Sequence, residues 1–265
     1  MTAAIFLNGA TLMTTPTPRV MSIARQVGYA GIEARAERLL KDVSELHATA
    51  EIARPEDVLS LNGVALTLHR DGRVNRDILD EDLAPRLRIC KEIGAPFLLA
   101  IPPRAPGVKT GPAIAGTREA LEHAREHAAA MNIRIAFEFL GFEDCPINTP
   151  ALAAETVDGI DGVELVLDAS HWYASGSPPL GAFPIGRLAL VHLNDVAARP
   201  PLEVEDGDRV LPGEGVVKLA ELIGELKAGG YSGPWSLETF NPSYWADDPD
   251  QVARRGLAAM ARLLD

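Results

Sequence analysis

Four short apolar runs in the second half of the chain each end in a side chain that can bind a divalent metal ion. Such runs, separated by helical stretches, are typical of parallel β-strands. They cover residues 134–138, 163–168, 188–192 and 234–238, and their last residues are Glu138, Asp168, His192 and Glu238. In a (β/α)8 barrel, the carboxyl ends of all strands open onto one face. We therefore expect these side chains to form a cup of carboxylates and one imidazole.

The length and the even spacing of the apolar runs favour one large core. The chain has 265 residues, and α/β barrels commonly use about 250 residues as a single unit. No Ser/Gly tract, charge block or low-complexity segment interrupts the chain in a way that would indicate a linker. We predict a single (β/α)8 TIM barrel, an α/β fold, with one domain over residues 1–265.

Hydrophobic periodicity and turn residues predict the remaining strands and helices. The other predicted strands are 5–7, 31–34, 64–68 and 97–101. The predicted helices are 17–28, 36–50, 77–93, 114–131, 149–157, a short one near Pro184, 216–227 and 249–264. Side chains alternate along a strand, so Arg134 shares a side with Glu138, and Glu164 shares one with Asp168. This alternation predicts a partly buried ion pair between Arg134 and Glu164 near the bottom of the barrel.

Charge and composition limit the classes of partner. The formal net charge is −12, and no Lys/Arg cluster forms the basic face that nucleic-acid binding needs. The two cysteines, Cys90 and Cys145, share no motif spacing, so we expect no disulfide, as in a reducing compartment. The N-terminus shows no targeting pattern, and no apolar stretch is long enough to span a bilayer. We expect a cytoplasmic protein with no nucleic-acid or membrane partner.

The four strand-end residues favour a catalytic metal site. One Glu at the end of a strand is more often a solvated loop residue, but four such groups at successive strands are hard to obtain by chance. Carboxylates with one imidazole suit Mn²⁺, Mg²⁺, Co²⁺ or a catalytic Zn²⁺ with open positions. They do not resemble the closed ligand sets of structural zinc sites.

Four segments around the strand ends carry distinctive motifs, which are residues 167–172 (LDASHW), 191–195 (VHLND), 209–215 (RVLPGEG) and 237–238 (LE). With these motifs the chain resembles the xylose isomerase-like barrel family of sugar phosphate isomerases and epimerases, and within it the inosose isomerase-type proteins. The resemblance covers nearly the whole chain. It implies one divalent metal ion, Mn²⁺ before Co²⁺, Mg²⁺ or Zn²⁺, with the ligands Glu138, Asp168, His192 and Glu238. It also implies that His171 and Arg209 hold the substrate, and that Glu138 and Glu238 transfer the proton.

The residue types agree with this substrate-binding role but do not require it. His171 lies three residues beyond Asp168 and could face the same pocket, or it could be a loop histidine in water. Arg209 could hold a substrate oxygen, or it could be an ordinary surface arginine.

Three further residues are candidates for contact with the substrate. Glu33 ends the second predicted strand, where it could line the pocket or pair with a nearby arginine such as Arg35. His69 ends the third predicted strand and could contact the substrate or support another residue that does. Trp172 could form a wall of the pocket or pack beneath a loop.

The favoured function is an isomerase or epimerase of a small polyhydroxy ketone, a keto-inositol or ketose. Removing a proton next to a carbonyl needs a base, and a divalent ion supplies positive charge to the oxygens of the resulting enediolate. A dehydratase acting on an inosose or 3-dehydroshikimate begins with the same proton removal, so the residues leave both open. An endonuclease of the same fold and a non-catalytic sugar-binding protein fit less well. The sequence leaves assembly into a homo-oligomer open.

Overall fold

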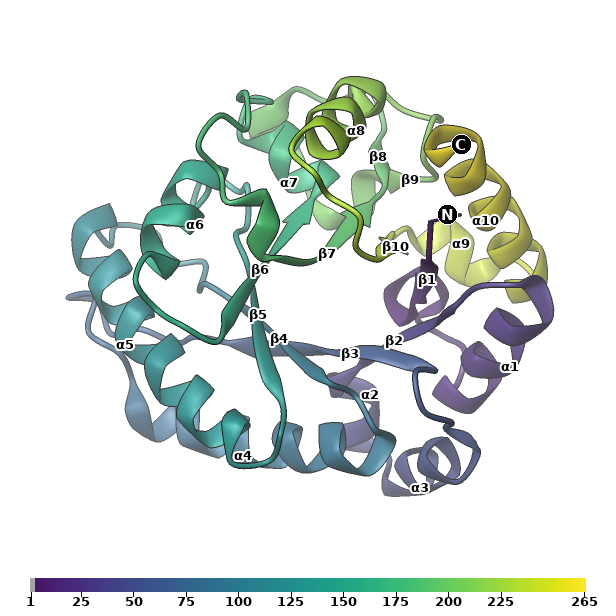
Figure 1. The fold of residues 1–265 in the computed structure, drawn as a ribbon, viewed down its shortest axis with the longest axis horizontal. Helices are drawn as coiled ribbons and strands as arrows, with labels where there is room; N and C mark the ends of the chain where they lie inside the picture. Colours follow the sequence, from purple (N-terminus) through teal and green to yellow (C-terminus); the bar gives the residue numbers. More distant parts are fainter. Residues whose placement is uncertain (1–2) are drawn as a thin grey trace.

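The computed structural model describes residues 3–265, which form a closed barrel of parallel strands surrounded by helices (Figure 1). The strands of the ring are β1 (Ile5–Asn8), β2 (Gly31–Arg35), β3 (Val58–Ala65), β4 (Phe97–Ile101), β5 (Arg134–Glu138), β6 (Val163–Asp168), β7 (Leu188–Leu193) and β10 (Trp235–Leu237). They follow one another in chain order, and β10 closes the ring by pairing with both β7 and β1. The predicted (β/α)8 barrel is confirmed.

The helices cover the outside of the ring (Figure 1). They are α1 (Thr17–Val27), α2 (Ala36–Lys41), α3 (Val43–Ile52), α4 (Arg76–Ile93), α5 (Thr110–Ala129), α6 (Pro150–Val157), α7 (Ala169–Ala174), α8 (Leu219–Ala228), α9 (Pro242–Ala246) and α10 (Pro249–Leu264). Short 3₁₀ turns lie at Gly9–Leu12, Ile185–Arg187, Pro201–Glu203 and Asp206–Asp208. No helix within residues 3–265 is both long enough and apolar enough to cross a membrane.

Local signals explain where several helices begin and end. Pro18 stands in the first turn of α1, and Gly28 ends that helix with a left-handed φ of 105°. The helix predicted over residues 36–50 is instead two helices, because Asp42 is extended between α2 and α3. The Asp42 side chain accepts hydrogen bonds from the backbone N–H groups of Ser44 and Glu45, so it caps α3.

The third strand was predicted incorrectly. The prediction placed it at residues 64–68, whereas β3 spans Val58–Ala65. Ser60 and Asn62 interrupt the apolar run of this strand. Their side chains are nevertheless buried, because they hydrogen-bond to Glu33 inside the barrel. A polar residue that faces a polar barrel interior breaks the pattern that identifies a buried strand.

The barrel interior is apolar at its lower end and polar at its mouth. Ala136 and Val166 pack with Phe6, Leu59 and other buried apolar residues inside the ring. Ile135 and Phe137, on the other side of β5, belong to the larger core between strands and helices. The predicted alternation along β5 and β6 is therefore confirmed, and it aims Glu138 and Asp168 into the mouth.

Two smaller predictions about the fold also have an outcome. Arg134 and Glu164 form the predicted ion pair, and the arginine also lies over the Phe97 ring, 4.0 Å from its centroid. The pair is more exposed than expected, since the Arg134 side chain is 54% accessible. Cys90 and Cys145 are both buried and free, as the absence of motif spacing predicted.

Candidate metal and substrate site

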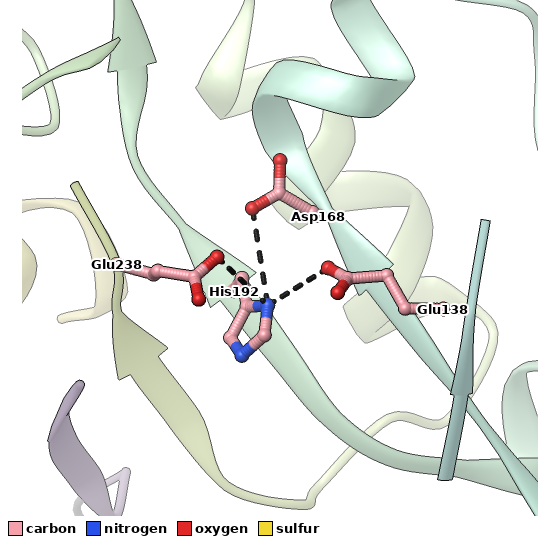
Figure 2. A group of neighbouring side chains, drawn as sticks. All are labelled: Glu138, Asp168, His192 and Glu238. Atoms are coloured by element: carbon pink, nitrogen blue, oxygen red, sulfur yellow. Dashed lines mark hydrogen bonds and ion pairs between the residues drawn. The ribbon is translucent and has the colours of Figure 1, made fainter. Parts of the chain in front are cut away.

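The four strand-end residues converge at the mouth of the barrel. Glu138, Asp168, His192 and Glu238 point toward one another from β5, β6, β7 and the residue after β10 (Figure 2). One ligand atom of each lies within 4.8 Å of the ligand atoms of the other three. All four side chains are buried. The sequence prediction placed these residues together, and the structure brings them together.

His192 lies at the centre of this cup, with its two ring nitrogens in different surroundings. Nδ1 lies 2.9 Å from Glu138 Oε1, 3.4 Å from Glu238 Oε2 and 3.9 Å from Asp168 Oδ2. Nε2 points the other way and lies 3.0 Å from Glu33 Oε1. Nδ1 is therefore the ring nitrogen that is available to a metal ion in the cup.

The electrostatics of the cup differ from one carboxylate to the next. Burial raises the pKa of Glu138 to about 7, although the nearby His192 opposes this shift. Burial also raises the pKa of Glu238, again against the effect of His192. Burial alone would raise the pKa of Asp168, but Arg209, two nearby histidines and a hydrogen bond from Ser170 together outweigh it and hold this pKa below its usual range. Perturbed carboxyl groups of this kind cluster at functional sites.

The cup fits a divalent metal ion by its donor chemistry. Three carboxylates and one imidazole nitrogen form a hard, oxygen-rich set that suits Mn²⁺, Mg²⁺, Co²⁺ or a catalytic Zn²⁺. The ligand atoms are close enough for one ion to contact all four side chains. A divalent charge would also offset the repulsion among three buried carboxylates.

Arg209 reaches the cup from outside the ring. It begins β9 (Arg209–Val210), which pairs antiparallel with β8 (Asp195–Val196). Its Nη1 donates to Glu238 Oε2 at 2.7 Å and to Asp168 Oδ2 at 3.2 Å. The side chain is only 2% exposed, so these charged hydrogen bonds lie in a largely dry environment.

His171 lies beside Arg209 because α7 begins directly after β6. Asp168 caps this helix, and its Oδ1 accepts a hydrogen bond from the His171 backbone N–H at 2.9 Å. Burial lowers the pKa of the imidazole to about 4. The ring is therefore neutral near pH 7, and its Nε2 can accept a hydrogen bond from Arg209 Nη2, 3.1 Å away. Phe142 packs against it edge to face, with the ring centroids 5.0 Å apart.

A cavity of about 410 Å³ opens over the cup. Two proposed ligands, Glu138 and Glu238, line it together with His171 and Arg209. Its other walls include Arg35, Asn62, Arg86, Ile101, Arg104, Phe142 and Phe240. The volume lies in the range of small-molecule sites, roughly 300–1,000 Å³. The structure thus places the two predicted substrate-holding residues, His171 and Arg209, where they can touch a molecule above the cup.

The predicted substrate contact by Glu33 needs correction. Glu33 is fully buried and is absent from the walls of the cavity. It does not pair with Arg35, which contacts Glu37 and Glu238 instead. Its partners are polar side chains of other strands inside the barrel, which are Asn8, Ser60, Asn62 and Ser236.

His69 and Trp172 also lie outside the cavity. His69 is exposed in the loop after β3, because that strand ends three residues earlier than predicted, at Ala65. Trp172 is buried on α7, and its Nε1 donates to the Pro178 carbonyl at 2.8 Å. Neither residue is placed to touch a substrate, so these two predictions are corrected as well.

Three asparagines near the cup were missed by the sequence analysis. Asn8 Nδ2 donates to Glu238 Oε1 at 3.0 Å, and Asn194 Nδ2 donates to Asp168 Oδ2 at 2.8 Å. Asn62 bonds Glu33 and also lines the cavity. Asn8 and Asn194 each follow an apolar strand run, and this position was the available signal. An amide side chain neither titrates nor binds a metal ion strongly, so its position at a strand end does not by itself indicate a metal site.

Comparison with known proteins agrees with this architecture. A family model described as xylose isomerase-like TIM barrel matches residues 21–263. The chain belongs to this family. The match includes all four residues of the cup, together with His171 and Arg209.

Individual relatives of the xylose isomerase-like family are similar over most of the chain. Inosose isomerase of Halalkalibacterium halodurans is 29% identical over 233 residues, covering 82% of this chain and 80% of that protein. A 3-dehydroshikimate dehydratase of Pseudomonas aeruginosa is 28% identical over 200 residues, covering 73% of this chain but only 31% of the dehydratase. A crystal structure of IolI protein with a binding zinc atom superposes with a TM-score of 0.88, at 26% identity and 98% coverage of both chains.

Proposed function

We propose that this protein is a divalent-metal-dependent isomerase or epimerase of a small polyhydroxy ketone, with keto-inositols (inososes) as the preferred substrates. The observation that carries the proposal is the convergence of three carboxylates and one imidazole beneath a cavity of about 410 Å³. The similarity to inosose isomerase over 82% of the chain supports the substrate class.

The chain provides two carboxylates that can transfer protons. When bound, the divalent ion would supply Lewis acidity, which stabilises the negative charge that develops on adjacent carbonyl and hydroxyl oxygens. Glu138 and Glu238 point toward one another and both line the cavity (Figure 2). In an isomerisation, one carboxylate removes the proton next to the carbonyl, a proton passes from the hydroxyl oxygen to the former carbonyl oxygen, and the other carboxyl group, protonated at the start, returns a proton to the former carbonyl carbon. In an epimerisation, the second carboxyl group returns the proton to the same carbon from the opposite face.

Arg209 and His171 complete the proposed site. Arg209 holds Glu238 at one oxygen and leaves the other facing Asn8, so the orientation of this base is fixed from two sides. Because Arg209 and His171 are hydrogen-bonded to each other and both line the cavity, they can orient a substrate hydroxyl together. Burial of the cup excludes most water from the region where the proton moves.

The charges of the cavity favour an uncharged substrate. Among the described residues that line it, every arginine already contacts a carboxylate: Arg35 with Glu37, Arg86 with Asp82, Arg104 with Asp144 and Glu205, and Arg209 with Asp168, Asp206 and Glu238. A phosphate or carboxylate group would have to compete with these partners for the guanidinium N–H groups. A keto-inositol carries no charge and needs only hydroxyl-binding groups, which the cavity provides.

The second candidate is a dehydratase that uses the same cup. The similarity to 3-dehydroshikimate dehydratase supports it, but that substrate carries a carboxylate, which the paired arginines disfavour. Product analysis by NMR in D₂O separates the two activities. Incorporation of solvent deuterium into a product of the same composition indicates isomerisation, whereas loss of water indicates dehydration.

A screen with metal-reconstituted enzyme tests the proposal. Keto-inositols and ketoses are offered to protein loaded with Mn²⁺, Co²⁺, Mg²⁺ or Zn²⁺, and products are identified. We propose Mn²⁺ as the native metal because the site is rich in hard oxygen donors, although the similar IolI structure contains zinc. We expect no binding to nucleic acid, given the net charge of −12. Metal binding without turnover of any polyol ketone would instead indicate a sugar-binding protein.

A further inference from the structure

Beneath the metal cup lies a second buried carboxylate site that no substrate can reach. Glu33, on β2, is fully buried and is absent from the cavity walls. Its oxygens accept hydrogen bonds from the side chains of four residues on three neighbouring strands: Asn8 at 3.0 Å, Ser60 at 2.6 Å, Asn62 at 3.0 Å, and Ser236. A carboxylate with this many donors is rigid and can be buried as an anion.

The fifth group on this carboxylate is His192. Its Nε2 lies 3.0 Å from Glu33 Oε1, while Nδ1 faces the three carboxylates of the cup. A neutral imidazole has one N–H group and one lone pair. An anionic acceptor at Nε2 keeps a proton on that nitrogen, so the proton lost on metal binding would be the one on Nδ1, whose lone pair would then point into the cup. Glu33 therefore selects both the tautomer and the ring orientation that metal binding requires.

The hydrogen bonds around Glu33 also extend to a second proposed metal ligand, Glu238. Asn8 Nδ2 lies 3.0 Å from Glu33 Oε1 and 3.0 Å from Glu238 Oε1. The orientation of Asn8 is itself fixed, since its Oδ1 accepts a hydrogen bond from the Ala10 backbone N–H at 2.9 Å. Through Asn8, the position of Glu33 is coupled to a carboxylate of the cup as well as to its imidazole.

We propose that Glu33 is a positioning residue for the metal site, which holds His192 in its metal-binding tautomer and, through Asn8, orients Glu238. This inference rests on the proposed metal function of the cup. Hydrogen-bonded groups behind metal ligands typically change metal affinity by about 10- to 100-fold when they are removed. We expect a loss of that size in E33Q, which keeps the size of the side chain but removes its charge.

The experiment measures Co²⁺ binding to the full-length, metal-stripped protein by calorimetry. The visible absorption bands of bound Co²⁺ are recorded as well, because they report its coordination geometry. The matched control is E45Q. Glu45 on α3 is also a largely buried carboxylate with several donors, from Arg38 and Thr17, but it lies outside the barrel. Urea unfolding shows whether the two variants lose similar stability.

The proposal predicts that Co²⁺ binds E33Q about 10- to 100-fold more weakly than wild type, with shifted absorption bands. E45Q should bind Co²⁺ with wild-type affinity and an unchanged spectrum. Equal affinity and spectra for E33Q and wild type would overturn the inference, and so would an equal loss in E45Q. Failure of the wild-type protein to bind any divalent metal would instead refute the proposed function itself.

A milder variant covers the case in which E33Q does not fold. S60A removes one hydrogen bond to Glu33 and only one oxygen atom from the core. With one donor lost, Glu33 is held less rigidly, and we expect Co²⁺ affinity to fall about fivefold, which is the effect of one typical hydrogen bond. Wild-type affinity in S60A, together with a failure of E33Q to fold, would assign Glu33 a role in folding alone and overturn the proposal.

Discussion

The two ends of β5 and β6 carry similar charged side chains in very different surroundings. At the amino ends, Arg134 pairs with Glu164, and their side chains are 54% and 26% exposed. At the carboxyl ends, Glu138 and Asp168 are almost completely buried and lie close to a third carboxylate, Glu238. The lower pair combines opposite charges in contact with water, whereas the upper cluster places like charges together away from water.

This difference separates groups that contribute modestly to stability from groups kept for function. An exposed ion pair contributes at most about 1 kcal/mol, because water and salt screen it. Burying several carboxylates together opposes folding unless a cation compensates them. Here His192 and Arg209 provide part of that compensation, and a bound metal ion would provide the rest. Substitutions at the mouth should therefore change mainly the activity, whereas substitutions at the amino ends should change only the stability, and only slightly.

The largest effect is expected for E238Q at the mouth. The amide cannot act as a base and is a poorer metal ligand, so kcat should fall about 10³-fold. The fold should remain intact, because Gln has the same size and can still accept a hydrogen bond from Arg209. Steady-state kinetics measures the fall in kcat, and far-UV circular dichroism shows whether the fold is intact. Near-normal turnover in this variant would remove Glu238 from the catalytic assignment.

Removal of the metal should have an effect of comparable size. A chelator should abolish turnover, and adding back a divalent ion should restore it. Because the ion binds only the folded state, a concentration of about 100 times Kd should add about 2.7 kcal/mol to the free energy of unfolding. Thermal unfolding with and without the ion measures this contribution. Full activity in a protein shown by elemental analysis to be metal-free would contradict the proposed chemistry.

R209K should have an intermediate effect. Lysine keeps the positive charge, but one ammonium group cannot replace the planar guanidinium that spans Glu238, Asp168 and His171. We expect kcat/KM to fall about 10- to 100-fold, while the protein still folds and binds metal. Kinetics and calorimetry together check this expectation. A wild-type kcat/KM would show that the arginine geometry is not used.

The smallest effect is expected at the amino end of the barrel. R134A removes the exposed ion pair with Glu164 and the contact with the Phe97 ring, so the free energy of unfolding should fall by about 1–2 kcal/mol. Neither kcat nor KM should change, because the substituted side chain is at the opposite end from the cup. Urea unfolding and kinetics measure the two quantities. A large loss of activity would break the separation between the two ends.

The metal cup could be predicted from the sequence because each of its residues ends an apolar strand run. The direction of a parallel strand then determines the face on which its last residue lies, without knowledge of register or loops. The same reasoning predicted the contact between Arg134 and Glu164, although Glu164 is in register with Ala136 and not with Arg134. Features that depend only on strand direction and on the alternation of side chains could therefore be predicted from the sequence.

The support beneath the cup could not be predicted in this way. Glu33 looked like another strand-end group, but its environment depends on which side chains of β1, β3 and β10 meet it. Ser60 and Asn62 even concealed the beginning of β3, because polar residues inside a barrel break the apolar pattern. That error moved the end of the strand to His69 and suggested a substrate contact that the structure does not contain.

Arg209 belongs to the β8–β9 hairpin and not to any strand of the ring. The Asp195 side chain anchors this excursion by accepting hydrogen bonds from the backbone N–H groups of Val196, Gly213 and Val217. The Arg209 guanidinium is therefore positioned by a separate antiparallel segment that has its own hydrogen bonds to Asp195. Replacing residues 195–217 by the corresponding segment of a relative would change the residues that contact the substrate. The eight-stranded barrel and the four side chains of the cup would stay unchanged.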